Sequence, residues 1–213
     1  MTANAWCAAF GKLDGAVNNA GVMDATDPTI PLDCERDRRL LPTSVDKATD
    51  EYWQGTLDTS LTGLFKSLRS ELRQFLAQGA GGSIVNVGSI TALTGMPGTP
   101  AYAASKHGVT GLTRNVALDC AGNGIRCNSV NMAQTGTPMY ERALQFVMWS
   151  RESGFGAGNM TKYKTESALQ VNDPAHRGST ASEQSAPILW LLSDDASNLT
   201  GACIATDGGW TAF

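Results

Sequence analysis

The sequence predicts an α/β fold in which helices cover both faces of a parallel sheet. Four short apolar segments, at residues 13–18, 83–87, 125–130 and 202–206, have the length and composition of buried strands. Segments with the helical spacing of apolar residues lie between them. Because the strand segments are apolar on both faces and alternate with helices, we expect a parallel sheet that is covered on both sides.

The first strand leads into a turn-forming sequence and a long loop. We expect one or two helical turns at residues 3–10, and the strand at residues 13–18 runs into Asn-Asn-Ala-Gly. Residues 24–46 contain three prolines and a charged run without a clean helical or strand period. This composition predicts a surface loop.

Two long helices are expected next. The first carries apolar residues at steps of three and four along one face, at Trp53, Leu57, Leu61, Leu64, Leu68, Leu72 and Phe75. Glycines at positions 79, 81 and 82 end this helix, because glycine tolerates the left-handed conformation of a helix cap. A Gly/Pro loop at residues 95–100 then precedes a second helix, which we expect over residues 101–121.

The pattern after the third strand is less regular. Residues 137–182 form a variable, Gly-rich stretch, and a short helix is expected near residues 183–193, with Pro187 in its first half. The fourth strand follows at residues 202–206.

Composition excludes several classes of protein. The 213 residues are 42% hydrophobic and 17% charged, which predicts one globular domain over residues 1–213. Sixteen Lys and Arg against 20 Asp and Glu give a net charge of −4, so we expect no nucleic-acid partner. The sequence has neither a long apolar run nor the charge order of a signal peptide, so we expect a cytoplasmic protein without a membrane span. Five widely spaced cysteines and two histidines argue against a metal site.

Three side chains are candidates for acid/base chemistry. Tyr102 and Lys106 stand four residues apart on the second helix, so their side chains share one face. An ammonium group close to a phenol favours the phenolate and lowers its pKa toward neutrality. Ser89 follows the second strand, at the sheet edge where open parallel sheets bind ligands, and its hydroxyl could hydrogen-bond a substrate oxygen.

Taken together, the motifs resemble the short-chain dehydrogenase/reductase family from about residue 5 onward. The resemblance rests on Asn-Asn-Ala-Gly at residues 18–21, Gly-Ser at 88–89, Tyr-Ala-Ala-Ser-Lys at 102–106, Ile-Arg-Cys-Asn-Ser-Val-Asn at 125–131 and Asp-Gly-Gly-Trp at 207–210. It implies a Rossmann-type fold and an oxidoreductase that uses NAD or NADP on a secondary alcohol or ketone.

The resemblance also implies a role for each matching residue. Tyr102 would be the catalytic acid/base, Lys106 would lower its pKa and hold the nicotinamide ribose, and Ser89 would steady the substrate oxygen. Thr137 would contact the nicotinamide carboxamide, and Asn19, Ala20 and Gly21 would shape the loop beside the cofactor. Residues 137–182 would form a substrate lid. Its apolar side chains suit a bulky hydrophobic ligand or serve only for packing, namely Met139, Tyr140, Phe146, Met148, Trp149 and Phe155.

The sequence departs from the family pattern in three places. The TGxxxGxG turn that cradles the cofactor pyrophosphate is missing, and the seventeen residues before Asn18 are too few for a βαβ unit. We therefore expect a fold that lacks the first βαβαβ segment, weakened cofactor binding and an apolar strand edge at residues 13–18. Ser60 stands where the family has an Asn in a proton relay, and Met-Ala at 132–133 replaces Pro-Gly.

Three hypotheses follow for the function. The chain is an N-terminally shortened NAD(P)-dependent dehydrogenase, or it is a cofactor-independent acid/base enzyme such as an isomerase, dehydratase or cyclase. Alternatively, it is an inactive remnant that acts through dimerisation. The helices at residues 53–75 and 101–121 resemble those of the family's dimer interface, so we expect a homo-oligomer that binds a small-molecule substrate.

Overall fold

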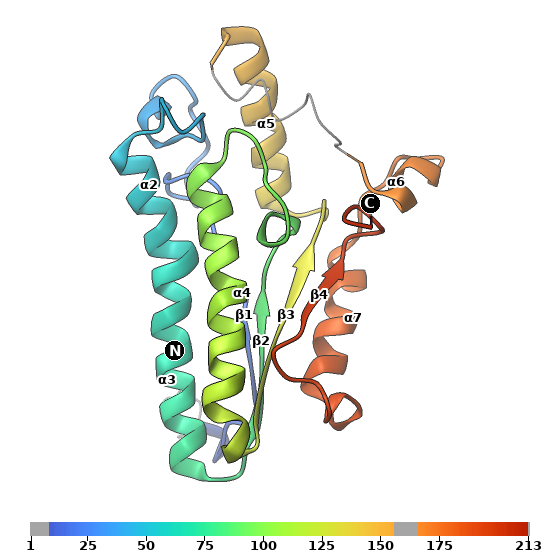
Figure 1. Ribbon diagram of the computed structural model, residues 1–213. Coiled ribbons are helices and arrows are strands. Elements are labelled where there is room, and N and C mark those ends of the chain that lie inside the picture. Colours follow the sequence, from blue (N-terminus) through green and yellow to red (C-terminus); the bar gives the residue numbers. More distant parts are fainter. Residues whose placement is uncertain (1–8, 156–165, 213) are drawn as a thin grey trace.

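The computed structural model describes residues 9–155 and 166–212 and contains a parallel sheet of four strands. The strands are β1 (Gly15–Asn18), β2 (Gly82–Val87), β3 (Ile125–Met132) and β4 (Cys203–Thr206), and they lie in this order across the sheet (Figure 1). All four predicted strands are confirmed to within two residues at each end. The expected helical turns at residues 3–10 lie largely outside the described residues.

The register aligns the carboxyl ends of the strands at one edge of the sheet. Val17 pairs with Val85, Val87 pairs with Val130, and Val130 pairs with Ile204. In this register, the loops that follow β1, β2 and β3 leave the sheet side by side.

One face of the sheet is covered by the two long helices. The first consists of α2 (Asp50–Leu57), a π-helical segment η2 (Asp58–Thr62) and α3 (Gly63–Gln78), and it ends at Gly79, whose φ is +65°. The second is α4 (Pro100–Cys120), which contacts both α2 and the strands (Figure 1). The prediction for this face is confirmed over α3, where Leu64, Leu68, Leu72 and Phe75 pack in one cluster with Ile84, Val109 and Cys127. It is wrong over α2, because the predicted Trp53 is 41% exposed and the buried residues there are Tyr52 and Thr56.

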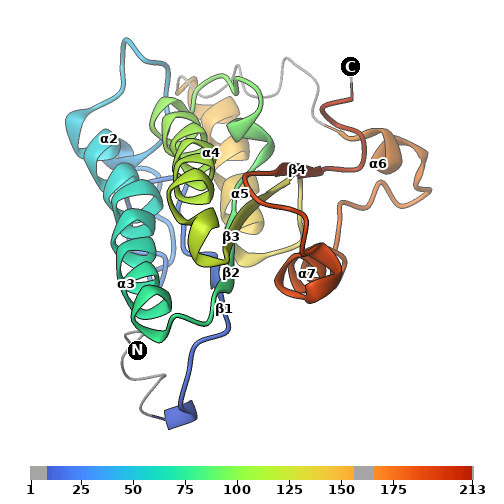
Figure 2. The same cartoon turned by 60° about the horizontal axis from the view of Figure 1, so that its bottom comes forward.

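The opposite face is covered by α7 (Ala181–Leu192), so that α4 and α7 lie on different sides of the strands (Figure 2). Leu191 packs there with Val85 and Val130. The helix begins with a capping box in which Thr180 and Glu183 satisfy each other's backbone N–H groups. Both the helix predicted at residues 183–193 and its internal Pro187 are therefore confirmed.

The prediction of a surface loop at residues 24–46 is wrong in part. Leu32, Cys34 and Leu41 are buried, and they pack against Phe146 of α5 (Pro138–Ser153). The single turn η1 (Arg38–Leu40) lies within this loop. Charges and prolines marked the segment as exposed, but its three buried apolar residues have no regular spacing, because they meet a helix from elsewhere in the chain.

The stretch at residues 137–182 is more regular than predicted. It contains α5 and the short helix α6 (Ala168–Asn172), whereas residues 156–165 of the expected lid lie outside the described residues. Helix α5 lies above the carboxyl ends of the strands (Figure 1).

Strand β1 forms one edge of the sheet within the described part of the chain. Its Val17 is 44% exposed, and a hollow of about 710 Å³ runs between β1 and α3. The expected apolar edge is therefore present. No helix among residues 9–155 and 166–212 combines the length and apolarity needed to cross a membrane.

Candidate active site

The carboxyl ends of β1, β2 and β3 open into a cavity of about 690 Å³. Seven of the eight predicted site residues line it, namely Asn19, Ala20, Gly21, Ser89, Tyr102, Lys106 and Thr137. The eighth, Ser60, lies one layer behind the cavity wall, within hydrogen-bond distance of Val22. Residues separated by more than a hundred positions in the chain thus meet at one place.

Tyr102 and Lys106 lie in the first two turns of α4. The helix begins at Pro100, which suits a first helical position because its fixed φ is already helical. The four-residue spacing then places both side chains on the face that lines the cavity. Ser89 follows β2 and caps the 3-10 turn η3 (Ile90–Ala92), with its Oγ accepting from the Thr91 N–H at 3.2 Å.

Lys106 is a buried cation beside the phenol. Its side chain is 4% exposed, its Nζ donates to the Val87 carbonyl at 3.0 Å, and it lies 5.6 Å from the centre of the Tyr102 ring. Burial lowers the pKa of Lys106 to about 8, because desolvation disfavours the charged form. At neutral pH this lysine is therefore charged but easily deprotonated.

The pKa of Tyr102 moves opposite to the prediction. The residue is 8% exposed, and burial raises its pKa, while a hydrogen bond with the Ser89 side chain partly offsets that rise. The expected lowering by Lys106 is not found, because the dominant effect is desolvation of the phenolate. Ser89 is the group that favours the ionised form.

Ser60 occupies the π-helical segment of the long helix. Its hydroxyl both donates to the Val22 carbonyl and accepts from the Val22 N–H, each at 3.0 Å. π-Helical turns place side chains out of the regular helical register and are frequent at functional sites. One hydroxyl thereby fixes the chain just after Gly21, although it lacks the two donors of an amide.

Gly21 lies beside Lys106 and Ser60. A Cβ atom at this position would lie 3.4 Å from Lys106 Nζ and 3.7 Å from Ser60 Oγ, which are ordinary van der Waals distances. An alanine would therefore fit here, whereas a longer side chain would approach the lysine.

Thr137 has a structural contact besides its place in the cavity wall. It is the N-cap of α5, where its Oγ1 accepts from the Tyr140 N–H at 3.3 Å, and it donates to the Thr135 carbonyl at 3.3 Å. A ligand that hydrogen-bonds the Thr137 hydroxyl would therefore compete with, or reorient, the N-cap bond of α5.

The predicted lid residues divide into two groups. Met139 and Tyr140 line the cavity, whereas Phe146, Trp149 and Phe155 pack together against the 24–46 loop. Met148 is 60% exposed. The stretch therefore divides into residues that line the cavity and residues that pack against the loop, and contact with a ligand stays a prediction.

Several wall residues were missed in the sequence. The apolar ones are Met23, Ile90, Met96, Ala143, Leu144, Val147 and Trp210, and the polar ones include Gln134 and Gln170. The spacing of Met139, Ala143 and Val147 is a helical signal that could have identified α5 and its cavity face. Gln170 is buried and donates to Gln134 Oε1 at 3.2 Å and to the His176 carbonyl at 3.0 Å.

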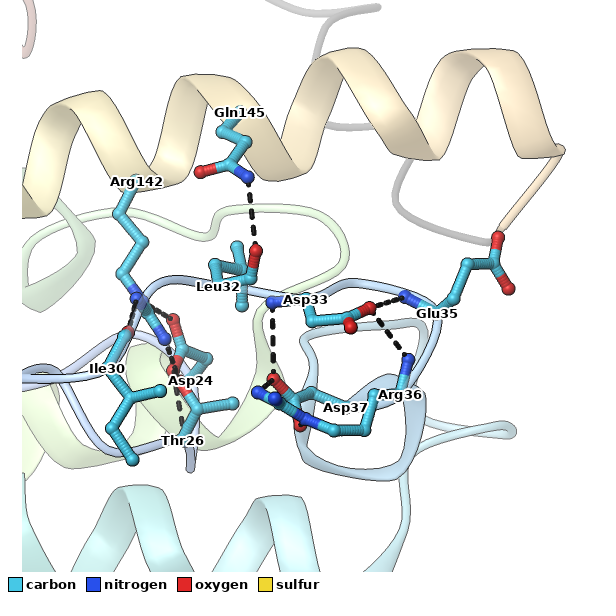
Figure 3. Close-up of polar contacts among 10 residues, drawn as sticks. All are labelled: Asp24, Thr26, Ile30, Leu32, Asp33, Glu35, Arg36, Asp37, Arg142 and Gln145. Atoms are coloured by element: carbon cyan, nitrogen blue, oxygen red, sulfur yellow. Dashed lines mark hydrogen bonds and ion pairs between the residues drawn. The ribbon is translucent and has the colours of Figure 1, made fainter.

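Arg142 joins α5 to the 24–46 loop and is not among the residues that line the cavity. Figure 3 shows its guanidinium reaching from α5 to Asp24, Thr26 and Ile30 of the loop. The neighbouring Gln145 donates to the Leu32 carbonyl at 3.2 Å. The wall formed by α5 is therefore bonded to the loop that follows β1.

The donor set suits one end of a nicotinamide dinucleotide. Hydroxyl, amide and ammonium groups from Tyr102, Lys106, Thr137 and Asn19 share the cavity, and they match a ribose and a carboxamide. Backbone nests that bind a pyrophosphate often contain a residue with positive φ, commonly glycine. The wall contains two glycines, Gly21 and Gly88, and neither has a positive φ. The wall of this cavity thus fits the nicotinamide end, and its two glycines do not form such a nest for a pyrophosphate.

Comparison with known proteins gives consistent matches over nearly the whole chain. The family profile described as Enoyl-(Acyl carrier protein) reductase matches residues 2–211. A 3beta-hydroxysteroid dehydrogenase of Mediterraneibacter gnavus is 36% identical, over 96% of this chain and 68% of the relative. A 2,5-dichloro-2,5-cyclohexadiene-1,4-diol dehydrogenase of Sphingobium indicum is 35% identical, over 97% of this chain and 70% of the relative.

Solved structures give the same result. Levodione reductase superposes with a TM-score of 0.75 at 30% identity, over 98% of this chain and 70% of that chain. Carveol dehydrogenase from Mycobacterium avium in complex with NAD gives a TM-score of 0.77 at 26% identity, over 99% of this chain and 69% of that chain. In each comparison the present chain spans about seven tenths of the protein that it matches.

Proposed function

Because the chain belongs to the short-chain dehydrogenase/reductase family, we propose that it interconverts a secondary alcohol and a ketone, using NAD or NADP. One observation carries the proposal. Ser89, Tyr102 and Lys106 come from a strand end and a helix, and they line one cavity at the carboxyl edge of the sheet. This is where open α/β sheets bind their ligands.

In this proposal Tyr102 handles the proton. In the oxidation direction, its ionised oxygen takes the proton of the substrate hydroxyl, and in reduction its O–H returns a proton to the carbonyl oxygen. Ser89 donates a hydrogen bond to the same substrate oxygen and stabilises the charge that develops there. A bound nicotinamide supplies or accepts the hydride at the substrate carbon.

Lys106 serves the same reaction through its charge. When the cavity holds a ligand, an ammonium beside the phenol stabilises the phenolate that oxidation requires. Its ammonium lines the same cavity and would also donate hydrogen bonds to the ribose hydroxyls of the nicotinamide nucleotide. Asn19, Ala20, Gly21 and Thr137 complete the nicotinamide end of the site.

Binding of the whole dinucleotide by the 213-residue chain is expected to be weak. Two or three charge-assisted hydrogen bonds to a pyrophosphate are worth about 1.5–3 kcal/mol each. Without them, the affinity should fall on the order of a thousandfold or more.

The cavity wall favours a neutral, hydrophobic ring substrate. Apolar side chains from α5 and the neighbouring loops form most of it, and Lys106 is the one charged residue in the described wall. The hydrogen-bonded pair of Gln134 and Gln170 adds a neutral polar strip that suits a second oxygen on the ring. Four of the similar proteins are named for alcohols or ketones with a carbocyclic ring.

Kinetic measurements with simple ring alcohols test the proposal. Cyclohexanol, trans-1,4-cyclohexanediol and a 3β-hydroxysteroid are the test substrates, each assayed for oxidation at saturating NAD or NADP. Nucleotide binding is measured separately by titration calorimetry. We expect Tyr102→Phe to lower kcat by about 10²–10⁴-fold, because the proton acceptor is lost. Urea unfolding of Tyr102→Phe is the control and should show that the variant is folded under the assay conditions.

The outcomes separate the candidate activities. Turnover in nucleotide-free protein that Tyr102→Phe abolishes would favour a cofactor-independent isomerase, dehydratase or cyclase. Retention of wild-type kcat by Tyr102→Phe would exclude the proposed acid/base. Micromolar NADH or NADPH binding would show that the pyrophosphate contributes less than we infer.

We also propose that the long helices mediate association with a second copy. Apolar residues are exposed on them, including Trp53 on α2, Phe65 on α3 and Leu118 on α4. Burial of such side chains against a second copy would stabilise a dimer. A monodisperse monomer in light scattering at micromolar concentration would contradict this expectation.

A further inference from the structure

Helix α5 uses two faces for two purposes. Five residues at helical spacing face the substrate cavity, namely Met139, Tyr140, Ala143, Leu144 and Val147. The adjacent face meets the 24–46 loop through Arg142, Gln145, Phe146 and Trp149. Since both faces belong to one rigid helix, a shift at the loop face moves the cavity wall as well.

Arg142 makes the most concentrated set of loop contacts. Its Nε donates to Asp24 Oδ2 at 3.3 Å, its Nη1 donates to the Ile30 carbonyl at 3.0 Å, and its Nη2 donates to the Thr26 hydroxyl. The Arg142 and Asp24 side chains are only 17% and 12% exposed, so the pair is shielded from solvent. A guanidinium reaches these three acceptors at once because its donors form a fixed fork, which a lysine lacks.

The loop side of this contact also adjoins the cavity. Asp24 directly follows Met23, which lines the cavity, and Gly21 and Ala20 precede it. Further along the loop, Trp149 Nε1 donates to Glu35 Oε1 at 3.0 Å, and Phe146 packs with Leu32 and Leu41. Helix α5 and the chain that follows Met23, which both contribute residues to the cavity wall, are thus joined by these contacts. Figure 3 shows the bonds from Arg142 and Gln145 to the loop.

We propose that Arg142 is a positioning residue that sets the width of the substrate cavity, by holding α5 against Asp24, Thr26 and Ile30. The expected effect on substrate preference rests on the proposed function. The contacts between Arg142 and the loop do not depend on that function. Arg142 touches neither the substrate nor the reacting atoms in this proposal. It acts through Ala143, Leu144 and Met23.

Hydrogen exchange followed by mass spectrometry tests the tie without any ligand. In Arg142→Met, the amides of residues 139–153 should exchange at least about tenfold faster, and so should the Ala25 amide, which donates to the Leu40 carbonyl at 2.9 Å. Amides of α4 should keep their wild-type rates. Arg151→Met, an exposed arginine in the last turn of the same helix, is the matched control and should change neither segment.

Substrate kinetics tests the consequence. For cyclohexanol and the larger decahydro-2-naphthol, we expect Arg142→Met to change the ratio of the two KM values at least about fivefold. The kcat values should stay within about twofold, because Ser89, Tyr102 and Lys106 lie on other elements. Arg142→Lys keeps the charge but not the fork, and it should fall between the wild type and Arg142→Met in both measurements.

Three results would overturn the proposal. Unchanged exchange in residues 139–153 would show that Arg142 does not hold α5, and an unchanged KM ratio with faster exchange would show that α5 does not set the cavity width. If the amides of α4 exchange faster by the same factor as those of α5 in both Arg142 variants, the protein is destabilised globally, and this result would also refute a positioning role. If the wild type oxidises neither alcohol, the proposed function fails, while the exchange measurement still decides the tie.

Discussion

Replacement of Lys106 by methionine should stabilise the protein at neutral pH and abolish its proposed function. The side chain is 4% exposed, and burial lowers its pKa from 10.5 to about 8. Each unit of pKa shift corresponds to about 1.4 kcal/mol, so burial of the charge costs about 3 kcal/mol at pH 7. The hydrogen bond to the Val87 carbonyl recovers part of this cost. We therefore expect Lys106→Met to unfold with a free energy about 1–2 kcal/mol higher than that of the wild type.

The pH dependence identifies the cause. Between pH 8 and 10.5 the unfolded chain binds the proton of Lys106 more tightly than the folded chain does, so the wild type gains stability as the pH rises. The penalty is complete below about pH 8 and disappears above 10.5, where the lysine is neutral in both states. The difference between the wild type and Lys106→Met should therefore shrink from pH 7 to pH 10.

Urea unfolding at pH 7, 8, 9 and 10 measures this difference. Lys66→Met, at an exposed lysine of α3, is the control and should stay within about 0.5 kcal/mol of the wild type at every pH. The reasoning is refuted if Lys106→Met is less stable than the wild type at pH 7, or if the difference in unfolding free energy keeps its size up to pH 10. In either case, burial of the charged lysine does not destabilise the fold.

Two further substitutions probe the attachment of the first strand to the long helix. Ser60→Ala leaves the Val22 N–H and carbonyl without their partner, so we expect the unfolding free energy to fall by about 2 kcal/mol. We also expect turnover to be lost at temperatures where the variant is still folded. Wild-type turnover by the folded variant would contradict this expectation. Glu71→Gln should stabilise the fold at pH 7, because burial raises the pKa of Glu71 and ionisation of the carboxyl therefore costs stability above about pH 4.5. Its advantage over the wild type should vanish below that pH, and an advantage that persists at pH 4 in urea unfolding would exclude ionisation as the cause.

The strands and long helices were predictable because their signals are local. Each strand is a short apolar run, and the face of the long helix repeats every three or four residues. Its π-helical segment could not be predicted, since Asp58–Thr62 carries no local signal for a change of helical register. Helix α5 was missed because it buries two faces, so its apolar residues do not form one stripe, although Thr137 and Pro138 are typical of a helix start.

The site was predictable only where its spacing is local or its motif is familiar. Tyr102 and Lys106 share a helix face by their four-residue separation, and Ser89 follows a strand. The contact between Arg142 and Asp24 joins residues 118 positions apart, and no pattern in either segment indicates it. The rise in the Tyr102 pKa was missed for a related reason, because its burial depends on how distant elements enclose the cavity.

The position of the β1 loop in the site depends on polar side chains more than on burial. Strand β1 pairs with β2, but its Val17 is 44% exposed, so apolar packing holds this edge weakly. Three side chains of the long helix compensate along the strand. Gln78 exchanges two hydrogen bonds of 2.8 Å with the Leu13 backbone, Glu71 accepts from Asn18 at 3.0 Å, and Ser60 exchanges two with Val22. Because these bonds flank residues 19–21, the long helix fixes the loop that faces Lys106. Weakening any of these bonds should disturb the proposed nicotinamide end of the cavity first. Ser89 and Tyr102 should be disturbed later, because they lie on better-packed elements.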